Sequence, residues 1–182
     1  MNDGVEIPIL GLGVYLTSEG SSCVETVKFA LKKGYRHIDT AEFYGNERSV
    51  AEGIRSSGIP RKDVFVTSKI WSTEGGYQGT LNHVRTTLSN TGLQYFDLFL
   101  IHAPQGRNVS ECYRALHDLK KQNLIRSVGV SNFGVHSPGS SSGKRDFLLP
   151  PTTKLNSTPG SKRETLLITA RRTTLHSRHT HH

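Results

Sequence analysis

The strongest constraint on the fold of this chain is a regular alternation of apolar runs and helical stripes. Between the runs, apolar residues recur at spacings of three and four, as they do along one face of a helix. Parallel strands joined by such helices cross over with a right hand, which gives either a barrel or a doubly wound sheet. The pattern therefore predicts an α/β fold. The expected strands cover residues 10–14, 37–39, 64–69, 98–101 and 125–130.

Local signals predict where the chain turns and where its helices begin. Asn2-Asp3-Gly4 is a hairpin-turn signal. Ser22 and Glu25 have the spacing of a capping box, so we expect the first helix to begin at Ser22. Asn46 is expected to cap the second helix, and Gly58 follows its last turn.

The alternation stops after Phe133. Residues 137–143 read Ser-Pro-Gly-Ser-Ser-Ser-Gly, which is linker composition, and the remainder is rich in Ser, Thr, Pro, Lys and Arg. The chain has 182 residues, whereas a complete (β/α)8 barrel usually needs about 250. We therefore expect residues 1–134 to form one folded domain and residues 135–182 to form a basic, largely disordered tail.

The formal net charge of +8 comes mainly from this tail. Residues 1–134 hold 15 Lys and Arg against 13 Asp and Glu, whereas residues 135–182 hold 8 against 2. Such an excess can attract phosphate, with Arg171, Arg172 and Arg178 as contacts. No aromatic residues interleave with these arginines to stack on bases. Nucleic-acid binding therefore ranks last among the functions we consider.

The sequence disfavours a membrane protein, an exported protein and a metal-binding protein. There is no apolar run of about 18 residues and no signal-peptide pattern, so we expect a cytoplasmic protein without a membrane span. Cys23 and Cys112 fall on expected helices at no metal-ligand spacing, which favours buried free thiols over a disulfide. No metal site is expected.

Four polar residues stand at or just past the ends of expected strands: Asp39, Tyr44, Lys69 and His102. A phenol beside an ammonium group is one way to protonate a carbonyl oxygen near neutral pH, because the ammonium favours phenolate and lowers the phenol pKa. Each residue alone also has an ordinary explanation: a strand-end turn, a packed ring, a solvated lysine or a core histidine. Their combination favours a catalytic site.

The four polar residues stand within or beside five motifs. These are Gly34-Tyr35-Arg36-His37-Ile38-Asp39-Thr40-Ala41, Tyr44-Gly45-Asn46-Glu47, Ser68-Lys69, Asp97 to Pro104, and Gly129-Val130-Ser131-Asn132-Phe133. In this order they resemble the motifs of the aldo-keto reductase family, and the resemblance covers about residues 4 to 135. It implies a (β/α)8 barrel, of which this chain would contain about five βα units, with NADPH as cofactor. It also implies reduction of an aldehyde or ketone to an alcohol.

The resemblance assigns a role to each of the four polar residues. Tyr44 would be the proton donor, and Lys69 would lower its pKa. Asp39 would hold Lys69 through a charge-assisted hydrogen bond, while His102 would bind and orient the substrate oxygen.

The resemblance also implies a cofactor site. Gly13, Val14 and Tyr15 match the stretch after the first strand that lies near the nicotinamide, and Asp39 borders the same place. Ser131 and Asn132 match the side chains that hold the carboxamide. An alternative for that pair is a simple helix cap after the fifth strand.

The substrate is expected to be a small carbonyl compound. The resemblance places Trp71 at a position that often lines the substrate pocket, together with Tyr15 and His102. Plain packing is the alternative explanation for a tryptophan just past a strand.

The family's later elements have no counterpart in residues 135–182. These are a glutamine and a tyrosine beside the nicotinamide, and a lysine-serine motif and an arginine that hold the adenosine phosphates. Two hypotheses follow: a reductase with weak or no turnover, or a non-catalytic truncated isoform or mispredicted gene product whose sequence changes near His136. In either case the first and fifth strands would be open edges, so we expect a monomer or non-specific self-association.

Overall fold

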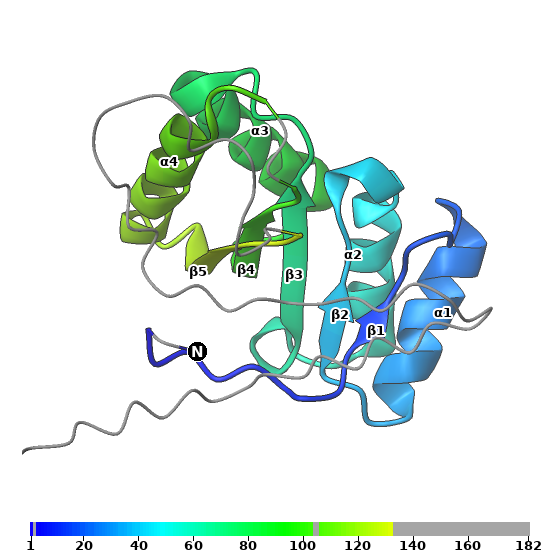
Figure 1. Ribbon diagram of the computed structural model, residues 1–182. Helices are drawn as coiled ribbons and strands as arrows, with labels where there is room; N and C mark the ends of the chain where they lie inside the picture. The colour runs from blue at the N-terminus through cyan, green and yellow to red at the C-terminus, as the bar shows by residue number, and fades with distance from the viewer. Residues whose placement is uncertain (2, 104–105, 133–182) are drawn as a thin grey trace, which may run out of the picture.

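The computed structural model describes residues 1, 3–103 and 106–132. The described chain forms a five-stranded parallel sheet in the order β1-β2-β3-β4-β5, with four helices along its outer side (Figure 1). This confirms the predicted α/β fold; the expected tail, residues 135–182, lies outside the described residues. The elements are β1 (Leu12–Gly13), α1 (Ser21–Lys32), β2 (His37–Asp39), the 3-10 helix η1 (Glu42–Tyr44), α2 (Glu47–Ser57), the 3-10 helix η2 (Arg61–Asp63), β3 (Phe65–Ile70), α3 (Gly76–Thr91), β4 (Phe96–Ile101), α4 (Val109–Lys121) and β5 (Ile125–Val130).

Strand register divides the sheet into two faces. Successive residues of a strand point to opposite sides, and residues paired across parallel strands share a side. Asp39 pairs with Thr67, and Lys69 pairs with Leu100, so these residues lie on the inner face. Ile38 and Val66 also pair, and they belong to the main core between the outer face and the helices.

The lower part of the inner face is apolar and is covered by the N-terminal segment. Phe65, Leu98 and Leu100 form a small core against which Met1, Val5 and Ile7 pack. Figure 1 shows this segment passing below the strands. The Asp3 carboxylate holds the N-terminal segment in place, because it accepts hydrogen bonds from Lys120 at 2.6 Å and from Ser127 at 2.7 Å.

The first strand is shorter than predicted, and the prediction of a hairpin before it is wrong. Instead of residues 10–14, only Leu12–Gly13 form β1. The ladder ends because the chain turns after Val14, whose carbonyl accepts a bond from the Thr17 N–H at 3.1 Å. Gly4 does make a turn, but no strand follows it in residues 5–9.

The capping predictions are partly wrong. Helix α1 begins at Ser21 with Gly20 at the N-cap, so Ser22 and Glu25 form no capping box. Asn46 does stand at the N-cap of α2, but its side chain makes no capping bond. Gly58 is confirmed as the residue that closes α2, in the left-handed conformation with φ of 75°.

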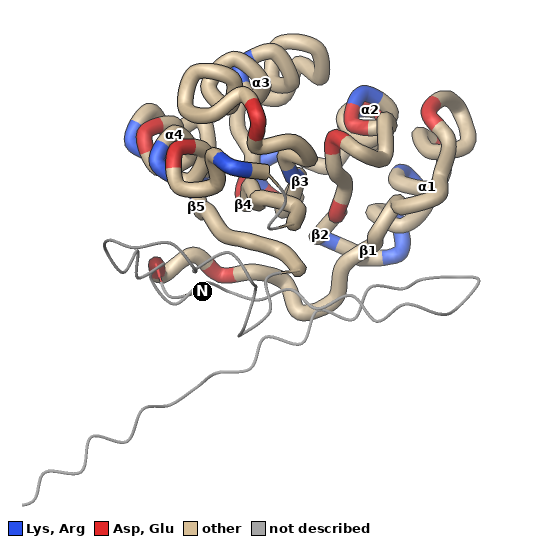
Figure 2. Tube along the Cα trace, turned by 45° about the horizontal axis from the view of Figure 1, so that its top comes forward, with Lys and Arg blue, Asp and Glu red and all other residues tan. Residues whose placement is uncertain are grey.

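The distribution of charge, the cysteines and the length of the helices complete the description of the fold. Figure 2 shows acidic and basic residues interspersed along α2 and α4 rather than gathered by sign. Cys23 and Cys112 are buried free thiols, as predicted. Within residues 1, 3–103 and 106–132, none of the helices has the length and apolar character needed to cross a bilayer.

Candidate active site

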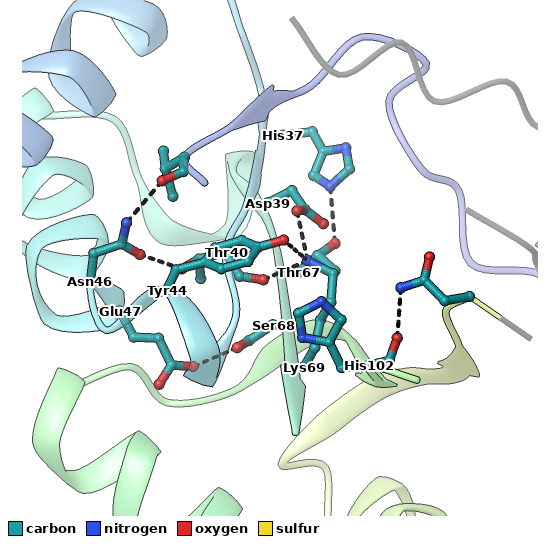
Figure 3. Close-up of polar contacts among 12 residues, drawn as sticks. His37, Asp39, Thr40, Tyr44, Asn46, Glu47, Thr67, Ser68, Lys69 and His102 are labelled. Atoms are coloured by element: carbon teal, nitrogen blue, oxygen red, sulfur yellow. Dashed lines mark hydrogen bonds and ion pairs between the residues drawn. The ribbon is translucent and has the colours of Figure 1, made fainter. Parts of the chain in front are cut away.

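The four predicted catalytic side chains come together at the carboxyl end of the sheet (Figure 3). Asp39 is the last residue of β2, Lys69 lies in β3, and His102 directly follows β4. Tyr44 is the last residue of η1, in the loop after β2. Parallel strands bring their carboxyl ends to one edge, which is why residues from separate motifs meet there.

Lys69 is the centre of the site, and its ammonium group has three hydrogen-bond acceptors. Its Nζ donates to Asp39 Oδ1 at 2.7 Å, to the Thr40 carbonyl at 2.8 Å and to the Tyr44 hydroxyl oxygen at 3.3 Å. An ammonium group has three protons, so this set uses its full donor capacity. Both members of the Lys69–Asp39 ion pair are buried.

Two polar atoms of the site are buried without a hydrogen-bond partner among the residues that the structure describes: Asp39 Oδ2 and His102 Nδ1. Burial and, to a smaller extent, the nearby Lys69 ammonium lower the pKa of His102 to about 4, against the opposing effect of Asp39. The imidazole is therefore neutral at pH 7. A neutral imidazole has one donor and one acceptor nitrogen, so it can give a hydrogen bond to a substrate oxygen.

The predicted direction of the Tyr44 pKa shift is wrong. Burial raises this pKa above its ordinary value; the Lys69 ammonium and its hydrogen bond lower it, but not enough to reverse the sign. Asp39 adds to the increase. The sequence showed the neighbouring charge but not how far the ring is desolvated. Tyr44 is thus protonated at neutral pH, which is the form that donates a proton.

Aromatic rings surround His102. Trp71 lies edge-to-face with His102 at 5.0 Å between ring centroids, and Tyr44 does so at 5.8 Å. Phe43 stacks on Trp71 at 4.3 Å, although its side chain is 54% exposed. We did not single out Phe43 from the sequence; its apolar ring next to Tyr44 in a short loop is the signal that was available. Trp71 is therefore close to His102, and its role in lining a substrate pocket stays a prediction.

The predicted cofactor residues after β1 differ in their exposure. Gly13 pairs with Asp39 across the sheet. Val14 is fully buried in the main core. Tyr15 is about half exposed, and its ring lies 5.0 Å from the Tyr44 ring. Tyr15 is therefore the member of this group with an accessible side chain beside the phenol.

Ser131 and Asn132 lie beside His102 at the end of β5. The Ser131 N–H donates to the Ile101 carbonyl at 2.8 Å, which extends the β4–β5 ladder. Asn132 Nδ2 donates to the His102 carbonyl at 2.9 Å. Asn132 has φ of 59°, a left-handed conformation that asparagine tolerates better than most residues. The pair is thus close to the four polar residues, and its carboxamide role stays a prediction.

A polar layer behind Lys69 was missed by the sequence analysis. Ser68 donates a short hydrogen bond to Glu47, whose pKa is raised chiefly by burial. Glu42 accepts a bond from the Trp71 N–H at 2.7 Å. Through these bonds, Glu42 and Glu47 hold the Tyr44 loop against β3. In the sequence, Glu47 was visible only as part of a family motif, without a role.

No group of three or more His, Cys, Asp or Glu with metal-binding geometry is found among residues 1, 3–103 and 106–132.

Comparison with known proteins identifies the family. The sequence profile described as "Aldo/keto reductase family" matches residues 10–144. The chain is 49% identical over 140 residues to the uncharacterized oxidoreductase YtbE of Bacillus subtilis, covering 75% of this chain and 50% of that protein. It is 46% identical over 136 residues to glyoxal reductase of the same organism, covering 75% of this chain and 49% of that protein. This chain belongs to the aldo/keto reductase family.

Solved structures support the same assignment. An aldo/keto reductase from Brucella melitensis superposes with a TM-score of 0.70 at 46% identity, covering 74% of this chain and 53% of that one. An aldo-keto reductase of Bombyx mori in complex with NADP has a TM-score of 0.65 at 34% identity, covering 72% and 49%. The prediction of a partial (β/α)8 barrel is confirmed, and the chain spans about half the length of the curated relatives it matches.

Proposed function

We propose that this chain reduces an aldehyde or ketone to an alcohol with NADPH. One observation carries the proposal: the buried Lys69 ammonium contacts both the Tyr44 hydroxyl and the Asp39 carboxylate, and His102 lies against the same phenol ring. The family membership supports this reaction class.

The chain's own residues would supply the proton and the electrostatic stabilisation. Reduction of a carbonyl builds negative charge on its oxygen, so donors aimed at that oxygen lower the barrier. Tyr44, protonated at neutral pH, would donate its proton, and Lys69 would stabilise the phenolate that remains. Neutral His102 would hydrogen-bond the same oxygen and orient the substrate, while Asp39 would hold Lys69 in place.

The polar atoms of the site fit a dinucleotide. Asp39 Oδ2, which has no partner among the described residues, can accept a bond from a hydroxyl or amide group, and Gly13, which pairs with Asp39, has no side chain. We assign Gly13, Val14, Tyr15, Asp39, Ser131 and Asn132 to this site. When bound, the reduced nicotinamide supplies a hydride. The Bombyx mori relative in complex with NADP supports this choice of cofactor.

A binding experiment tests the cofactor assignment. A ligand stabilises only a state that binds it, by about 2.7 kcal/mol at one hundred times its Kd. We expect NADPH to raise the melting temperature of the chain and to give a saturable fluorescence titration. Ser131→Ala with Asn132→Ala should weaken both effects, whereas Ser110→Ala, on the exposed start of α4, should leave them unchanged.

The competing proposal is that the chain is catalytically inactive. It predicts an unshifted melt, no saturation with NADPH and no carbonyl-dependent oxidation of the cofactor. Those three results together would reject the reductase proposal. The cytoplasmic location and the monomeric state stay predictions, and sedimentation over a range of concentrations would separate a monomer from self-association.

A further inference from the structure

Asn46 is fully buried, and its side-chain amide makes three hydrogen bonds, of which Figure 3 shows the one with Thr40. Nδ2 donates to the Val14 carbonyl at 2.9 Å and to the Thr17 carbonyl at 2.8 Å, while Oδ1 accepts from the Thr40 hydroxyl at 2.7 Å. Carbonyl oxygens only accept, so the NH2 group must face Val14 and Thr17, and the orientation of the amide is fixed by chemistry.

These bonds hold a strained turn. The turn runs from Val14 to Thr17 and is closed by the Thr17 N–H on the Val14 carbonyl at 3.1 Å. Within it, Leu16 has φ of 65°, although it is not glycine, and it is 84% exposed. A bulky residue at positive φ is disfavoured and persists only where the surroundings impose it. An exposed leucine side chain offers little packing to do so, which leaves the backbone bond that closes the turn and the two bonds from Asn46.

The same amide is connected to both sides of the active site. Tyr15 belongs to the strained turn, and its ring lies 5.0 Å from that of Tyr44. On the other side, Thr40 donates its hydroxyl proton to Asn46 and accepts a bond from Lys69 through its carbonyl at 2.8 Å. Asn46 therefore bridges the turn that carries Tyr15 to the residue that holds the ammonium group.

We propose that Asn46 is a positioning residue of this site: its amide holds the Val14–Thr17 turn against Thr40 and so keeps Tyr15 packed on Tyr44 beside Lys69. The proposal rests on the proposed function for its catalytic meaning. Helix capping is the structural alternative. It does not account for the three bonds, because the Asn46 carbonyl starts α2 through Val50 N–H while the side chain makes no capping bond.

The most direct test is Asn46→Asp. Aspartate keeps the shape and the acceptor oxygen for Thr40, but it cannot donate to the two carbonyls. The readout is 19F NMR of protein labelled with 3-fluorotyrosine, with two resonances assigned through Tyr15→Phe and Tyr44→Phe. We expect Asn46→Asp to move both resonances by more than their line widths. Thr91→Val, a buried change at the far end of α3, is the matched control and should leave them in place.

A second measurement distinguishes a residue that holds the Val14–Thr17 turn from one that only caps helix α2. Glycine adopts positive φ without strain, so Leu16→Gly relieves strain only while the turn is held in that conformation. We expect Leu16→Gly to change the melting temperature more favourably in the parent chain than in Asn46→Asp. Equal shifts in the two backgrounds would show that Asn46 does not hold the turn and would overturn the proposal.

Enzyme activity tests the positioning role independently of the NMR and melting measurements. If the parent chain oxidises NADPH with a carbonyl substrate, Asn46→Asp should lower kcat/KM at least tenfold, while Thr91→Val keeps it within twofold. An inactive parent would reject the proposed function and leave the NMR result to decide the positioning role. A folded Asn46→Asp with unmoved Tyr15 and Tyr44 resonances would overturn the positioning role alone. Where Asn46→Asp lacks a cooperative melt, Thr40→Val, which removes one of the three bonds, takes its place with the same expected direction.

Discussion

The two ends of the sheet each hold a buried carboxylate, but the two carboxylates differ in how fully they are paired. At the amino end, Asp97 forms an ion pair with Arg61 at 2.8 Å and accepts hydrogen bonds from Arg126 at 2.7 Å and from the Val66 N–H at 2.9 Å. At the carboxyl end, Asp39 is paired with Lys69 through one oxygen. Its other oxygen has no partner among the described residues.

This difference separates a structural carboxylate from one available to a ligand. Buried polar groups are nearly always hydrogen-bonded, so an unpaired buried oxygen calls for an explanation. In parallel α/β barrels the carboxyl end carries the chemistry and the amino end carries stability. Asp97, at the amino end, therefore fits a role in stability, and Asp39, at the carboxyl end, fits a role in the chemistry. Substitutions at each end of the sheet can show whether the two carboxylates differ in this way.

The largest effect is expected for Lys69→Met. Removing one partner of a buried ion pair leaves the other charge uncompensated, which costs about 3–5 kcal/mol of unfolding free energy. Urea unfolding measures this loss. The matched control is Lys28→Met, which breaks the exposed Lys28–Glu25 pair and should cost less than about 0.5 kcal/mol. Equal losses in the two variants would mean that Asp39 is not held as a buried charge.

The next effect concerns pH and His37, which lies on the inner face and bonds Thr67 at 2.9 Å. Burial lowers its pKa to about 4, with Asp39 raising it and Lys69 lowering it as smaller influences. Because the folded pKa lies below the unfolded value of 6.5, only the unfolded chain takes up a proton as the pH falls between these values. The unfolding free energy should therefore fall by up to about 3 kcal/mol from this residue between pH 6.5 and pH 4.

Replacing His37 checks that assignment. His37→Gln should reduce the loss of unfolding free energy between pH 7 and pH 4, measured by urea unfolding at each pH. His102 has a similarly depressed pKa, so a residual loss is expected to remain. An unchanged pH dependence in His37→Gln would show that His37 is not buried in the neutral form.

A smaller effect is expected at the amino end. Asp97→Asn removes the charge that pairs Arg61 and Arg126, and it should cost about 1–3 kcal/mol of unfolding free energy. Arg126 is about half exposed and can regain water, and Arg61 keeps its bonds to the Val64 and Tyr95 carbonyls, which limits the loss. Turnover per folded molecule should stay at the parent value, because Asp97 lies at the other end of the sheet. A fall in turnover greater than the loss of folded protein would contradict the division between the two ends.

The smallest effect is expected for Asp3→Asn. Burial alone would raise the pKa of Asp3, but bonds from Lys120, Ser127 and the Val5 N–H together hold it below its ordinary value. The stabilisation is therefore present at neutral pH and is lost as the pH falls through the folded pKa. Because the pair is partly exposed, Asp3→Asn should cost no more than about 1 kcal/mol at pH 7. Melts at pH 7 and pH 2 measure it; a gap between parent and variant that persists at pH 2 would contradict this origin.

The sequence predicted the strands and the four polar residues because both follow from local patterns. β5 was placed at its observed bounds, and Asp39, Lys69 and His102 were placed at strand ends. Parallel pairing then makes their meeting at one edge a geometric consequence. The motifs in which these residues stand also identified the family.

Long-range contacts were beyond the reach of the sequence. Asn46 has the residue type and position of a helix cap, yet its partners are 6 to 32 residues away. The sign of the Tyr44 pKa shift depends on the balance between burial and the Lys69 charge, and burial is a property of the assembled site. Likewise, the short contact between Glu47 and Ser68 joins an α2 residue to the back of β3.

The most direct test of the account is turnover by Tyr44→Phe. This change removes the hydroxyl that bonds Lys69 and keeps the ring, so folding should be preserved while the proton donor is lost. Loss of a general acid typically lowers the rate by about 10²–10⁴-fold. The control is Tyr77→Phe, which removes a hydroxyl bonded to Asp118 on the helical surface. The account predicts that carbonyl-dependent NADPH oxidation falls by that factor in Tyr44→Phe alone; equal rates in parent, Tyr44→Phe and Tyr77→Phe would contradict it.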